Sequence, residues 1–429
     1  MIKLIDKTKV PFYDYFYLLC IIIYAGQASA LVRQLGDIRT IGNAIALILT
    51  IIFAIKKHVK FGISLFGVIS FFSVYCIFVT FATNSFYYLL WEYSRWIIYF
   101  FIAYVICKGY GSRFFVIAET IIYHLCIIGL ICWVLLLVIP QQFTSFISSI
   151  SLEWFNDKER FLSYNALFYT ISIHTVEDGI GEFDLIARNA GFAWEPGGFA
   201  CFICFGLFFN ILRTNFQLRN NKAVFVFLLA LLSTQSTTGY VVFGVMLLMW
   251  LLVNKKYLWA ILVVPILILM LRLPFLGDKL SVRAEGFSSL SMDSIAYGDS
   301  FDRLLSFKLF WLEFLRHPVL GYGFSQSWID QHDIATFSGI GQLLAQYGAI
   351  MTIVFISLLI KTAKKINLFF KSNCGILLLI AMIGMMISYR IWSQPFFIAI
   401  WLSCLFMKQA ENNSISMSNI SYNSSIIDK

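Results

Sequence analysis

Long apolar stretches recur along the whole sequence and are separated by short clusters of lysine and arginine. Of the 429 residues, 60% are hydrophobic and 13% are charged, against about 25% charged residues in an ordinary soluble domain. A transmembrane helix needs about 20 mostly apolar residues, because the hydrocarbon core offers no water to unpaired backbone groups. The sequence therefore predicts an all-α, polytopic integral membrane helical bundle, with the whole chain, 1–429, as a single membrane domain.

Stretches of this length define about twelve predicted transmembrane helices. The two spans between Lys222 and Lys255 are short, so a re-entrant hairpin is the alternative there. Ala28-Ser29-Ala30 imitates a signal-peptide cleavage site, but the long apolar run around it and the many later spans favour a retained anchor. Residues 408–429 are predicted to form a disordered cytoplasmic tail. The predicted spans are 12–32, 41–55, 61–81, 86–107, 114–139, 193–212, 222–236, 240–253, 257–272, 338–360, 374–390 and 393–407.

Lysine and arginine clusters alternate with these spans and indicate their orientation. With about twelve spans threaded, the clusters before the first span and after every second span fall on one side of the membrane. The positive-inside rule places these clusters and both termini in the cytoplasm. The net charge of +9 then faces anionic lipid head groups and does not indicate nucleic-acid binding. The two longest connections, 140–192 and 273–337, become extracytoplasmic loops.

The sequence lacks the common motifs of soluble enzymes. It has no Walker loop, no G-x-G-x-x-G after a strand, no H-E-x-x-H and no four-ligand spacing of cysteine and histidine, so ATP hydrolysis and structural zinc are poor interpretations. The nine cysteines lie in or beside apolar spans and predict no disulfide framework. Cys201 and Cys204 form a C-x-x-C for which apolar packing is favoured over redox or metal chemistry. We predict no metal and no cofactor.

The stretch RNAGFAWEPGGFACF, residues 188–202, places charge and glycine directly against an apolar run. Arg188 lies just before the sixth span, and Glu195-Pro196 lies at its start. Proline in a first helical turn loses no backbone hydrogen bond, and the free amide groups there favour an anion nearby. Arg188 as an interfacial anchor with Glu195 as a helix N-terminal charge is the alternative, but charge at this depth is costly and favours function. The stretch therefore predicts a mouth suited to a diphosphate.

A second cluster lies in the loop 273–337. Residues 302–316 show apolar side chains at helical spacing, and Pro318 and the glycines after it stop the pattern. We predict an amphipathic helix on the outer membrane surface, with Arg303 at its start and Arg283 upstream. Such a helix is also common as a simple interfacial element.

A third cluster, STQSTTGY at 233–240, interrupts apolar sequence with hydroxyl groups. The apolar run around it is too long for one span, so the break predicts a turn close to the outer face. The hydroxyls either satisfy backbone groups in the turn or form a polar floor for a sugar.

Taken together, four motifs resemble the O-antigen polymerase and O-antigen ligase superfamily. This family combines an outer R-x-x-G followed by glutamate and proline, a polar S-x-x-G break two spans later, H-P-x-x-G-x-G after an amphipathic helix, and a closing L-L-A-x-Y-G. Here these pieces are Arg188 to Gly191 with Glu195 and Pro196, Ser236 to Gly239, His317 to Gly323, and Leu343 to Gly348.

The resemblance implies a multi-pass glycosyltransferase of the bacterial inner membrane with its active site facing the periplasm. Its substrate is an oligosaccharide on undecaprenyl diphosphate in the membrane, and a chain-length regulator is a candidate partner. Departure of the diphosphate develops negative charge that fixed arginines can meet, and a base removes the proton of the acceptor hydroxyl. Glu195, His332 and Asp333 are the candidate bases, in that order. The candidate catalytic residues are Arg188, Glu195, Arg303, Arg283 and His332, and the candidate substrate-binding residues are Gly191, Ser236, Thr237, Thr238, His317 and Tyr322.

Two departures from the family pattern bear on the exact reaction. Ligase-like members tend to carry a histidine shortly before L-L-A-x-Y-G, where this chain has Thr336, Phe337 and Ser338. The S-x-x-G break often holds an arginine, where this chain has threonines. The missing histidine favours a polymerase over a ligase and leaves the identity of the base open. A lipid-linked oligosaccharide flippase, for which Glu92 and Arg95 are the main intramembrane pair, and a protein-glycosylating transferase are the further alternatives.

Overall fold

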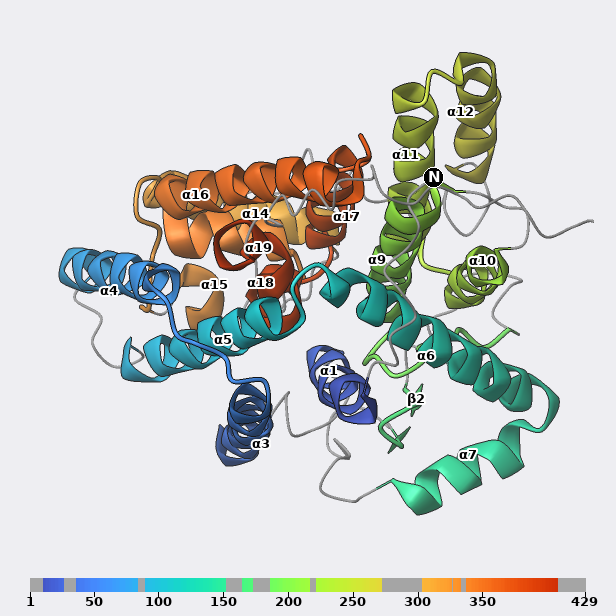
Figure 1. Ribbon diagram of the computed structural model, residues 1–429, viewed down its shortest axis with the longest axis horizontal. Coiled ribbons are helices and arrows are strands. Elements are labelled where there is room, and N and C mark those ends of the chain that lie inside the picture. The colour runs from blue at the N-terminus through green and yellow to red at the C-terminus, as the bar shows by residue number, and fades with distance from the viewer. Residues whose placement is uncertain are drawn as a thin grey trace, which may run out of the picture.

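The computed structural model is almost entirely helical (Figure 1). It describes residues 11–26, 36–83, 89–151, 164–172, 186–216, 221–271, 303–325, 327–332 and 337–407. The helices are α1 (Phe12–Ala25), α3 (Gly36–Lys56), α4 (Ile63–Thr83), α5 (Leu89–Tyr110), α6 (Arg113–Val138), α7 (Pro140–Ile150), α9 (Pro196–Thr214), α10 (Lys222–Thr234), α11 (Thr237–Val253), α12 (Tyr257–Leu271), α14 (Arg303–Arg316), α15 (Trp328–Gln331), α16 (Gly339–Phe370), α17 (Ile376–Met386), the 3-10 helix η3 (Ile391–Ser393), α18 (Pro395–Trp401) and α19 (Ser403–Phe406). Two short antiparallel strands, β1 (Tyr164–Asn165) and β2 (Thr170–Ile171), pair with Tyr164 opposite Ile171.

Several helices have the length and composition of membrane spans. Among the described residues, α4, α6, α9 and α16 are long and apolar enough to cross a membrane, and five shorter helices are also apolar. Large hydrophobic side chains face outward, such as Phe78 of α4 at 63% exposure and Leu258 of α12 at 80%, which suits lipid contact and would be a liability in water. The chain is thus an all-α protein of the membrane-embedded kind. The count of about twelve spans stays a prediction.

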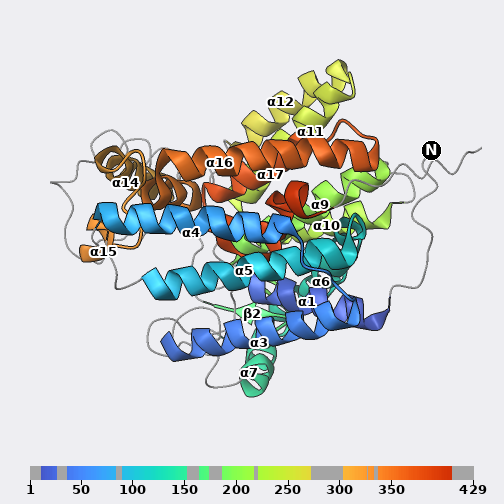
Figure 2. The same cartoon turned by 60° about the vertical axis from the view of Figure 1, so that its left-hand side comes forward.

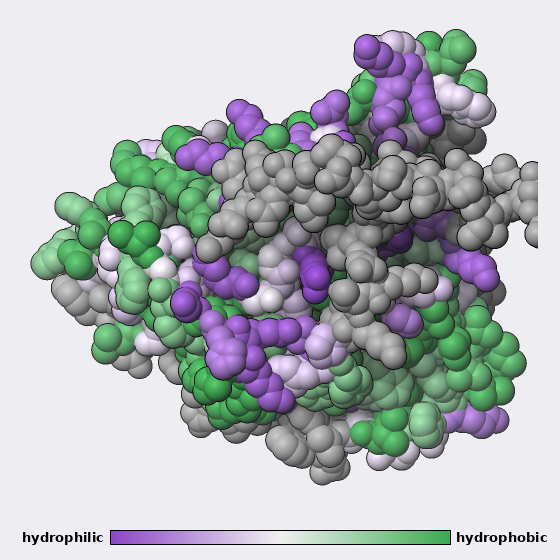
Figure 3. Space-filling model, in the orientation of Figure 1, coloured by the Kyte–Doolittle hydropathy of each residue, from purple (hydrophilic) through white to green (hydrophobic). Residues whose placement is uncertain are grey.

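The surface and the helix directions agree with this interpretation. Figure 2 shows α3, α4, α5 and α16 running roughly parallel, with α14 and α15 gathered at one end. In Figure 3, hydrophobic surface covers much of the left side and the lower right, while hydrophilic side chains gather toward the middle and at the tip formed by α11 and α12. Lys255 and Lys256 lie in the turn between these two helices.

Helix α9 is the centre of the bundle. It packs against α6, α10, α11 and α17, and nearly all of its side chains are buried, including Phe199, Phe205 and Phe208. Its sequence is apolar on every face, which is the pattern of a helix surrounded by other helices rather than by lipid on one side. Glu195 occupies the position before its first residue, Pro196, and Asn215 follows its last residue in the left-handed conformation.

The predicted turn in 233–240 is confirmed. Helix α10 ends at Thr234, Gln235 after it adopts a left-handed conformation, and α11 starts at Thr237. The Ser236 hydroxyl accepts a hydrogen bond of 3.2 Å from the Gly239 amide and so caps α11. The break is therefore formed by ordinary capping chemistry, which was the first of its two interpretations.

The motifs at 317–323 and 343–348 interlock and break α16. Gly348 has a φ of 66° inside α16, and a side chain there would collide with the Val319 carbonyl. The amide of Ala349 donates to Pro318 at 2.9 Å, and the amide of Gly323 donates to the Gln346 carbonyl at 2.9 Å. We call this interlocked pair, 317–323 with 345–349, the clasp. The predicted span 338–360 is thus a kinked helix that the clasp holds.

Helix α14 confirms the predicted helix 302–316 almost residue for residue. Its Leu309 and Phe310 are buried, and its main packing partner is α16. The apolar face that suggested contact with the membrane surface thus lies at least partly against protein. Interfacial contact of the remaining face stays a prediction.

The last two predicted spans are not continuous helices of the predicted length. Spans 374–390 and 393–407 appear as α17 followed by η3, α18 and α19. The polar segment Ser388 to Gln394 interrupts helical structure, and Pro395 restarts it as the first residue of α18. The segment 387–394 thus forms a non-helical connection with one 3-10 turn, which the hydropathy pattern did not show.

Polar contacts between helices gather at two ends of the bundle. At the end we call the basic end, Lys57 Nζ lies 2.6 Å from Asp14 in the first turn of α1. At the other end, the Trp194 amide donates a hydrogen bond of 3.2 Å to the carbonyl of Gly26, which follows the last residue of α1. Residues predicted on the cytoplasmic side contact one another at the basic end, and those predicted on the extracytoplasmic side do so at the opposite end. Alternation of the spans accounts for this segregation, while the orientation itself stays a prediction.

Candidate functional site

A cavity of about 330 Å³ lies at the end of the bundle opposite the basic end. Its walls come from the end of α1, the start of α9, residue 337 before α16, and the segment between α17 and α18. We call this the cavity end of the molecule. The lining residues are Ala25, Gly26, Trp194, Glu195, Gly198, Cys201, Phe202, Phe337, Ser388, Tyr389, Arg390, Ile391 and Gln394.

Glu195 contributes the carboxylate of the cavity. It is half-buried at the N-terminal cap of α9, where its carbonyl accepts a hydrogen bond of 3.1 Å from the Phe199 amide. Its side chain does not cap the helix. Gly197 in the same turn packs so closely on Tyr389 that any side chain would collide with the tyrosine hydroxyl. The close approach holds the segment 388–394 against the start of α9.

Arg390 contributes the cation of the cavity. It is exposed at the start of η3, and its carbonyl accepts a hydrogen bond of 3.1 Å from the Ser393 hydroxyl. The guanidinium offers five donors in a planar fork, the geometry that matches phosphate oxygens. A half-buried carboxylate and an exposed guanidinium thus line one polar pocket.

Gln394 adds an amide with an unused acceptor. The residue is 7% exposed, and its side-chain oxygen is buried without a hydrogen-bond partner among the described residues. Buried polar atoms in native structures nearly always have partners, and the exceptions call for an explanation such as a ligand or water. Because Gln394 lines the cavity, a hydroxyl-bearing ligand is a natural donor for this wall.

Arg188, the first candidate from the sequence, does not line this cavity among the described residues. It is half-buried, and its guanidinium donates to the carbonyls of Thr234 at 3.3 Å and Gln235 at 3.4 Å. These carbonyls lie at the C-terminus of α10, where a cation is favourable to the helix dipole. The observed contacts of Arg188 therefore tie the loop before α9 to the end of α10.

The neighbouring residues of this loop also contact other parts of the protein. Asn189 bonds to Ser233 through its backbone amide at 2.9 Å and its side-chain amide at 2.9 Å. Gly191 has a φ of 50° and lies under the ring of Phe199. The candidate Gly191 thus serves a tight turn, and no ligand contact follows from its position.

The three hydroxyl candidates of the break between α10 and α11 have different surroundings. Ser236 is buried and caps α11. Thr237 is half-buried at the first position of α11. Thr238 shares a hydrogen bond of 2.8 Å with Ser388, which lines the cavity. Of these three residues, Thr238 is thus connected to the cavity, through its hydrogen bond to the lining residue Ser388.

The candidates in the loop 273–337 lie at or near the clasp. His317 is exposed, and its backbone carbonyl accepts from the Gly321 amide at 2.9 Å. Tyr322 is buried, and burial together with nearby Asp330 raises its pKa, while Arg390 lowers it. The ring centroids of Tyr347 in the clasp and Trp392 in the segment 388–394 lie 5.3 Å apart, so the clasp borders this segment. Tyr322 is therefore a neighbour of the site rather than part of its lining.

The remaining candidates are engaged elsewhere or lie outside the described residues. The His332 ring stacks on Trp328 with centroids 4.1 Å apart, and its Nδ1 is 2.8 Å from the Trp328 carbonyl oxygen. Arg303 is the first residue of α14, but its side chain, together with Arg283, Asp333 and the tail 408–429, lies outside the described residues. Within the described part of the chain, no cluster of three or more His, Cys, Asp or Glu could hold a metal ion.

The sequence interpretation missed the segment Ser388 to Gln394, which supplies one wall of the cavity. The sequence pattern of this segment resembles that around Arg188 and Pro196, since Arg390 and Pro395 stand between two apolar runs. It was absorbed into the ends of two predicted spans. Charged residues at span ends are commonly anchors, so hydropathy alone does not distinguish Arg390 from an anchor.

Comparison with known protein families gave no match, and comparison with curated protein sequences gave no match either. The functional interpretation therefore depends on the residues of this chain. At the cavity end, the arrangement can bind an anionic group through Arg390 and the start of α9, and it can accept a proton at Glu195.

Proposed function

We propose that this protein is a glycosyltransferase that joins undecaprenyl-diphosphate-linked oligosaccharide repeat units, as an O-antigen or other surface-polysaccharide polymerase does. The reaction takes place at the periplasmic face of the bacterial inner membrane. The observation that carries the proposal is the cavity of about 330 Å³ that is lined by Glu195 and Arg390. The cavity lies at the end of the apolar helix bundle for which the positive-inside rule predicts an extracytoplasmic position.

The chemistry assigns a role to each polar wall. The bond between the anomeric carbon of the donor chain and its diphosphate breaks, and the same carbon bonds to a hydroxyl of the acceptor repeat unit. Arg390 and the first turn of α9 stabilise the negative charge that develops on the leaving diphosphate. Glu195 accepts the proton of the attacking hydroxyl. Gln394 accepts a hydrogen bond from a sugar hydroxyl through its buried oxygen.

The structure changes the order of the candidate residues. Glu195 remains the first choice of base because it lines the cavity. His332 is not among the lining residues, its ring stacks on Trp328, and its Nδ1 lies 2.8 Å from the Trp328 carbonyl oxygen. Arg390 replaces Arg188 as the first choice of cation, since it lines the cavity and Arg188 donates to helix carbonyls.

A flippase remains the candidate of another class, and one observation favours it. Glu92 and Arg95 form an ion pair within α5, and the Arg95 Nε is buried without a hydrogen-bond partner among the described residues. Buried charge in a membrane helix commonly marks a functional path. We favour the enzyme because a carboxylate and a cation meet at a single cavity at one end, which suits chemistry at one face.

The proposal is tested with purified full-length protein in liposomes that contain a synthetic undecaprenyl-diphosphate-linked repeat unit. Wild type should form products of several repeats, and Glu195→Gln should lower the rate by about 10²–10⁴-fold because the general base is lost. Asp330→Asn is the matched control, since Asp330 is an exposed carboxylate of the α15 capping box outside the cavity lining. No elongation by wild type, or equal rates for the two variants, would contradict the proposal.

A deletion strain provides a second test in the cell. Its surface lipopolysaccharide should carry a single repeat unit, because ligation of unpolymerised units continues without a polymerase. Complete loss of attached repeats would instead indicate a ligase or a flippase. Gel profiles of the surface polysaccharide distinguish these outcomes.

A further inference from the structure

An apolar crevice lies beside α4, separate from the polar cavity. It has a volume of about 370 Å³, within the range of about 300–1,000 Å³ of small-molecule sites. Figure 2 shows α4 between α16 and α5, and the crevice is walled by α4 and α16 over a floor from α5, α18 and α19. Its lining residues are Ser64, Gly67, Val68, Phe71, Phe72, Phe100, Met351, Val354, Leu358, Trp401, Leu402 and Leu405.

The crevice opens toward the surface that faces lipid. Phe71 and Leu405 at its edge are 45% and 38% exposed, and Gly67 leaves open space, since a Cβ added there meets no atom within 4 Å. Apart from the hydroxyl of Ser64, its lining side chains are aliphatic, aromatic or thioether groups. An apolar, laterally open crevice of this kind accepts hydrocarbon and offers nothing to a sugar or a phosphate.

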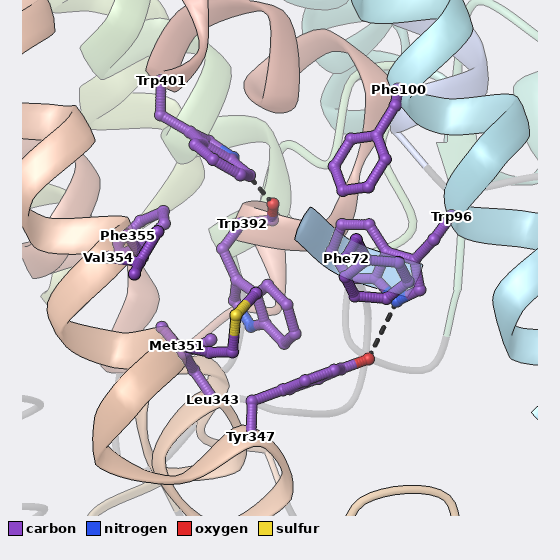
Figure 4. A pocket seen from close by; sticks show the side chains of 10 residues that line it. All are labelled: Phe72, Trp96, Phe100, Leu343, Tyr347, Met351, Val354, Phe355, Trp392 and Trp401. Atoms are coloured by element: carbon purple, nitrogen blue, oxygen red, sulfur yellow. Dashed lines mark hydrogen bonds between the residues drawn. The ribbon is translucent and has the colours of Figure 1, made fainter. Parts of the chain in front are cut away.

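A narrow continuation of the crevice reaches the segment that carries the polar site. This inner part has a volume of about 30 Å³ and shares Phe72, Phe100, Met351, Val354 and Trp401 with the outer crevice. Figure 4 shows its aromatic walls, with Trp392 between the side chains of α16 and those of α4 and α5. Hydrogen bonds lock the walls, because Trp401 donates to the Trp392 carbonyl at 3.0 Å and Trp96 donates to the Tyr347 hydroxyl at 2.8 Å.

The short helix η3 joins the apolar crevice to the polar cavity. Trp392 lines the crevice side, while its neighbours Ile391 and Arg390 line the cavity. A ligand with a charged head and a long hydrocarbon tail can therefore meet a cation on one side of η3 and apolar walls on the other. A free phosphate or a soluble sugar would make no favourable contact with the apolar walls.

We propose that the crevice binds the polyprenyl chain of the lipid-linked substrate, an inference that rests on the proposed function. Transfer from the bilayer into the crevice gains little hydrophobic free energy, because lipid tails are as apolar as the lining. The crevice instead orders the chain by van der Waals contact with rigid aromatic walls. Ordering the tail in turn presents the diphosphate to Arg390, which is the gain from pre-organisation.

The test is a comparison of two ligands that share a head group and differ in tail length. Undecaprenyl diphosphate and geranyl diphosphate are titrated against full-length protein in nanodiscs, and binding is measured directly rather than through turnover. Gly67→Trp fills the crevice from a position with room for a side chain. Ile77→Trp is the matched control, because Ile77 lies on the same helix, is 54% exposed and does not line the crevice.

Gly67→Trp should weaken undecaprenyl diphosphate binding by about tenfold and leave geranyl diphosphate within about twofold, while Ile77→Trp changes neither. An unchanged affinity for undecaprenyl diphosphate, or an equal loss for both ligands, overturns the tail assignment. Arg390→Ala tests the head-group site separately. If it weakens the binding of both ligands, the proposed head-group site stands even when the tail assignment fails. If wild type binds neither ligand, the proposed function itself fails.

Discussion

The basic end and the cavity end of the bundle both carry charged residues, but the two ends use them differently. At the basic end, Glu119 is 4% exposed and accepts two bonds of 2.7 Å from Arg213 and one of 2.6 Å from Asn210. At the cavity end, Glu195 and Arg390 line a hollow of about 330 Å³. At the basic end, charged side chains bond to each other inside the protein, and at the cavity end, charged side chains line a ligand-sized space.

Helix α9 connects the two arrangements. Arg213 lies in its last turn and Glu195 at its N-terminal cap, so each charge has the sign that the helix dipole favours at that end. A buried pair with satisfied hydrogen bonds is costly to disrupt, because the partner is left as an uncompensated charge. Glu195 is half-buried and Arg390 is exposed, and substitutions at positions that are not fully buried usually change stability less. The difference predicts that substitutions at the basic end affect folding and those at the cavity end affect chemistry.

The largest expected effect is on folding, from Glu119→Ala at the basic end. The substitution leaves Arg213, 27% exposed, without its carboxylate and removes one of the two acceptors of the Asn210 amide. It should lower the free energy of unfolding by about 3–5 kcal/mol. Thermal unfolding of the detergent-solubilised protein measures the loss. The double variant Glu119→Leu with Arg213→Leu should recover much of it, because no unpaired charge remains. A loss below about 1 kcal/mol for the single variant would show that the pair contributes like an exposed one.

The next effect is on turnover, from Arg390→Ala at the cavity end. Loss of one preorganised donor to a developing oxyanion should reduce the rate by about 10²–10³-fold. The exposed position of Arg390 predicts a change in stability within about 0.5 kcal/mol. Arg390→Lys separates charge from geometry, since a lysine keeps the charge but loses the bidentate fork. If Arg390→Ala lost as much stability as Glu119→Ala but kept a normal turnover rate, the two ends would not differ in the way proposed.

The third effect concerns the clasp that borders the cavity end. Gly348→Ala places a side chain at a φ of 66° and against the Val319 carbonyl, so we expect a loss of stability of about 1–3 kcal/mol. Gly67→Ala is the control, because its Cβ meets open space. Thermal unfolding of the two variants gives the comparison. Equal stability of Gly348→Ala and wild type would show that α16 can straighten without cost.

The sequence predicted those parts of the fold that depend on local pattern. The break in 233–240 followed from the length of the apolar run, and the helix 302–316 followed from spacing and from Pro318. Residues predicted on one side of the membrane also contact each other, as Lys57 and Asp14 do. Hydropathy, residue spacing and turn residues are local signals, so these elements could be predicted from the sequence.

The sequence could not show which helix ends meet. Arg390 joins Glu195 at one cavity only because the segment between α17 and α18 packs on the start of α9 through Gly197. The motif at 317–323 was interpreted as substrate binding, but its backbone bonds to α16 in the clasp. Long-range packing of this kind leaves no periodic pattern in the local sequence. It determines which candidate residues line the cavity and which have only structural contacts.

Arg188 gives the smallest expected effect and the sharpest test of the comparison. Its guanidinium donates to the C-terminal carbonyls of α10 at 3.3 and 3.4 Å, a contact for which a cation contributes about 0.3–1 kcal/mol. Arg188→Ala should therefore lower stability by about that amount and reduce turnover by less than about tenfold, an order of magnitude below Arg390→Ala. Rates and thermal unfolding of the two variants, measured side by side, provide the answer. Should Arg188→Ala lose as much turnover as Arg390→Ala, the diphosphate must reach beyond the cavity to the end of α10, and the arginine first chosen from the sequence would share the catalytic charge.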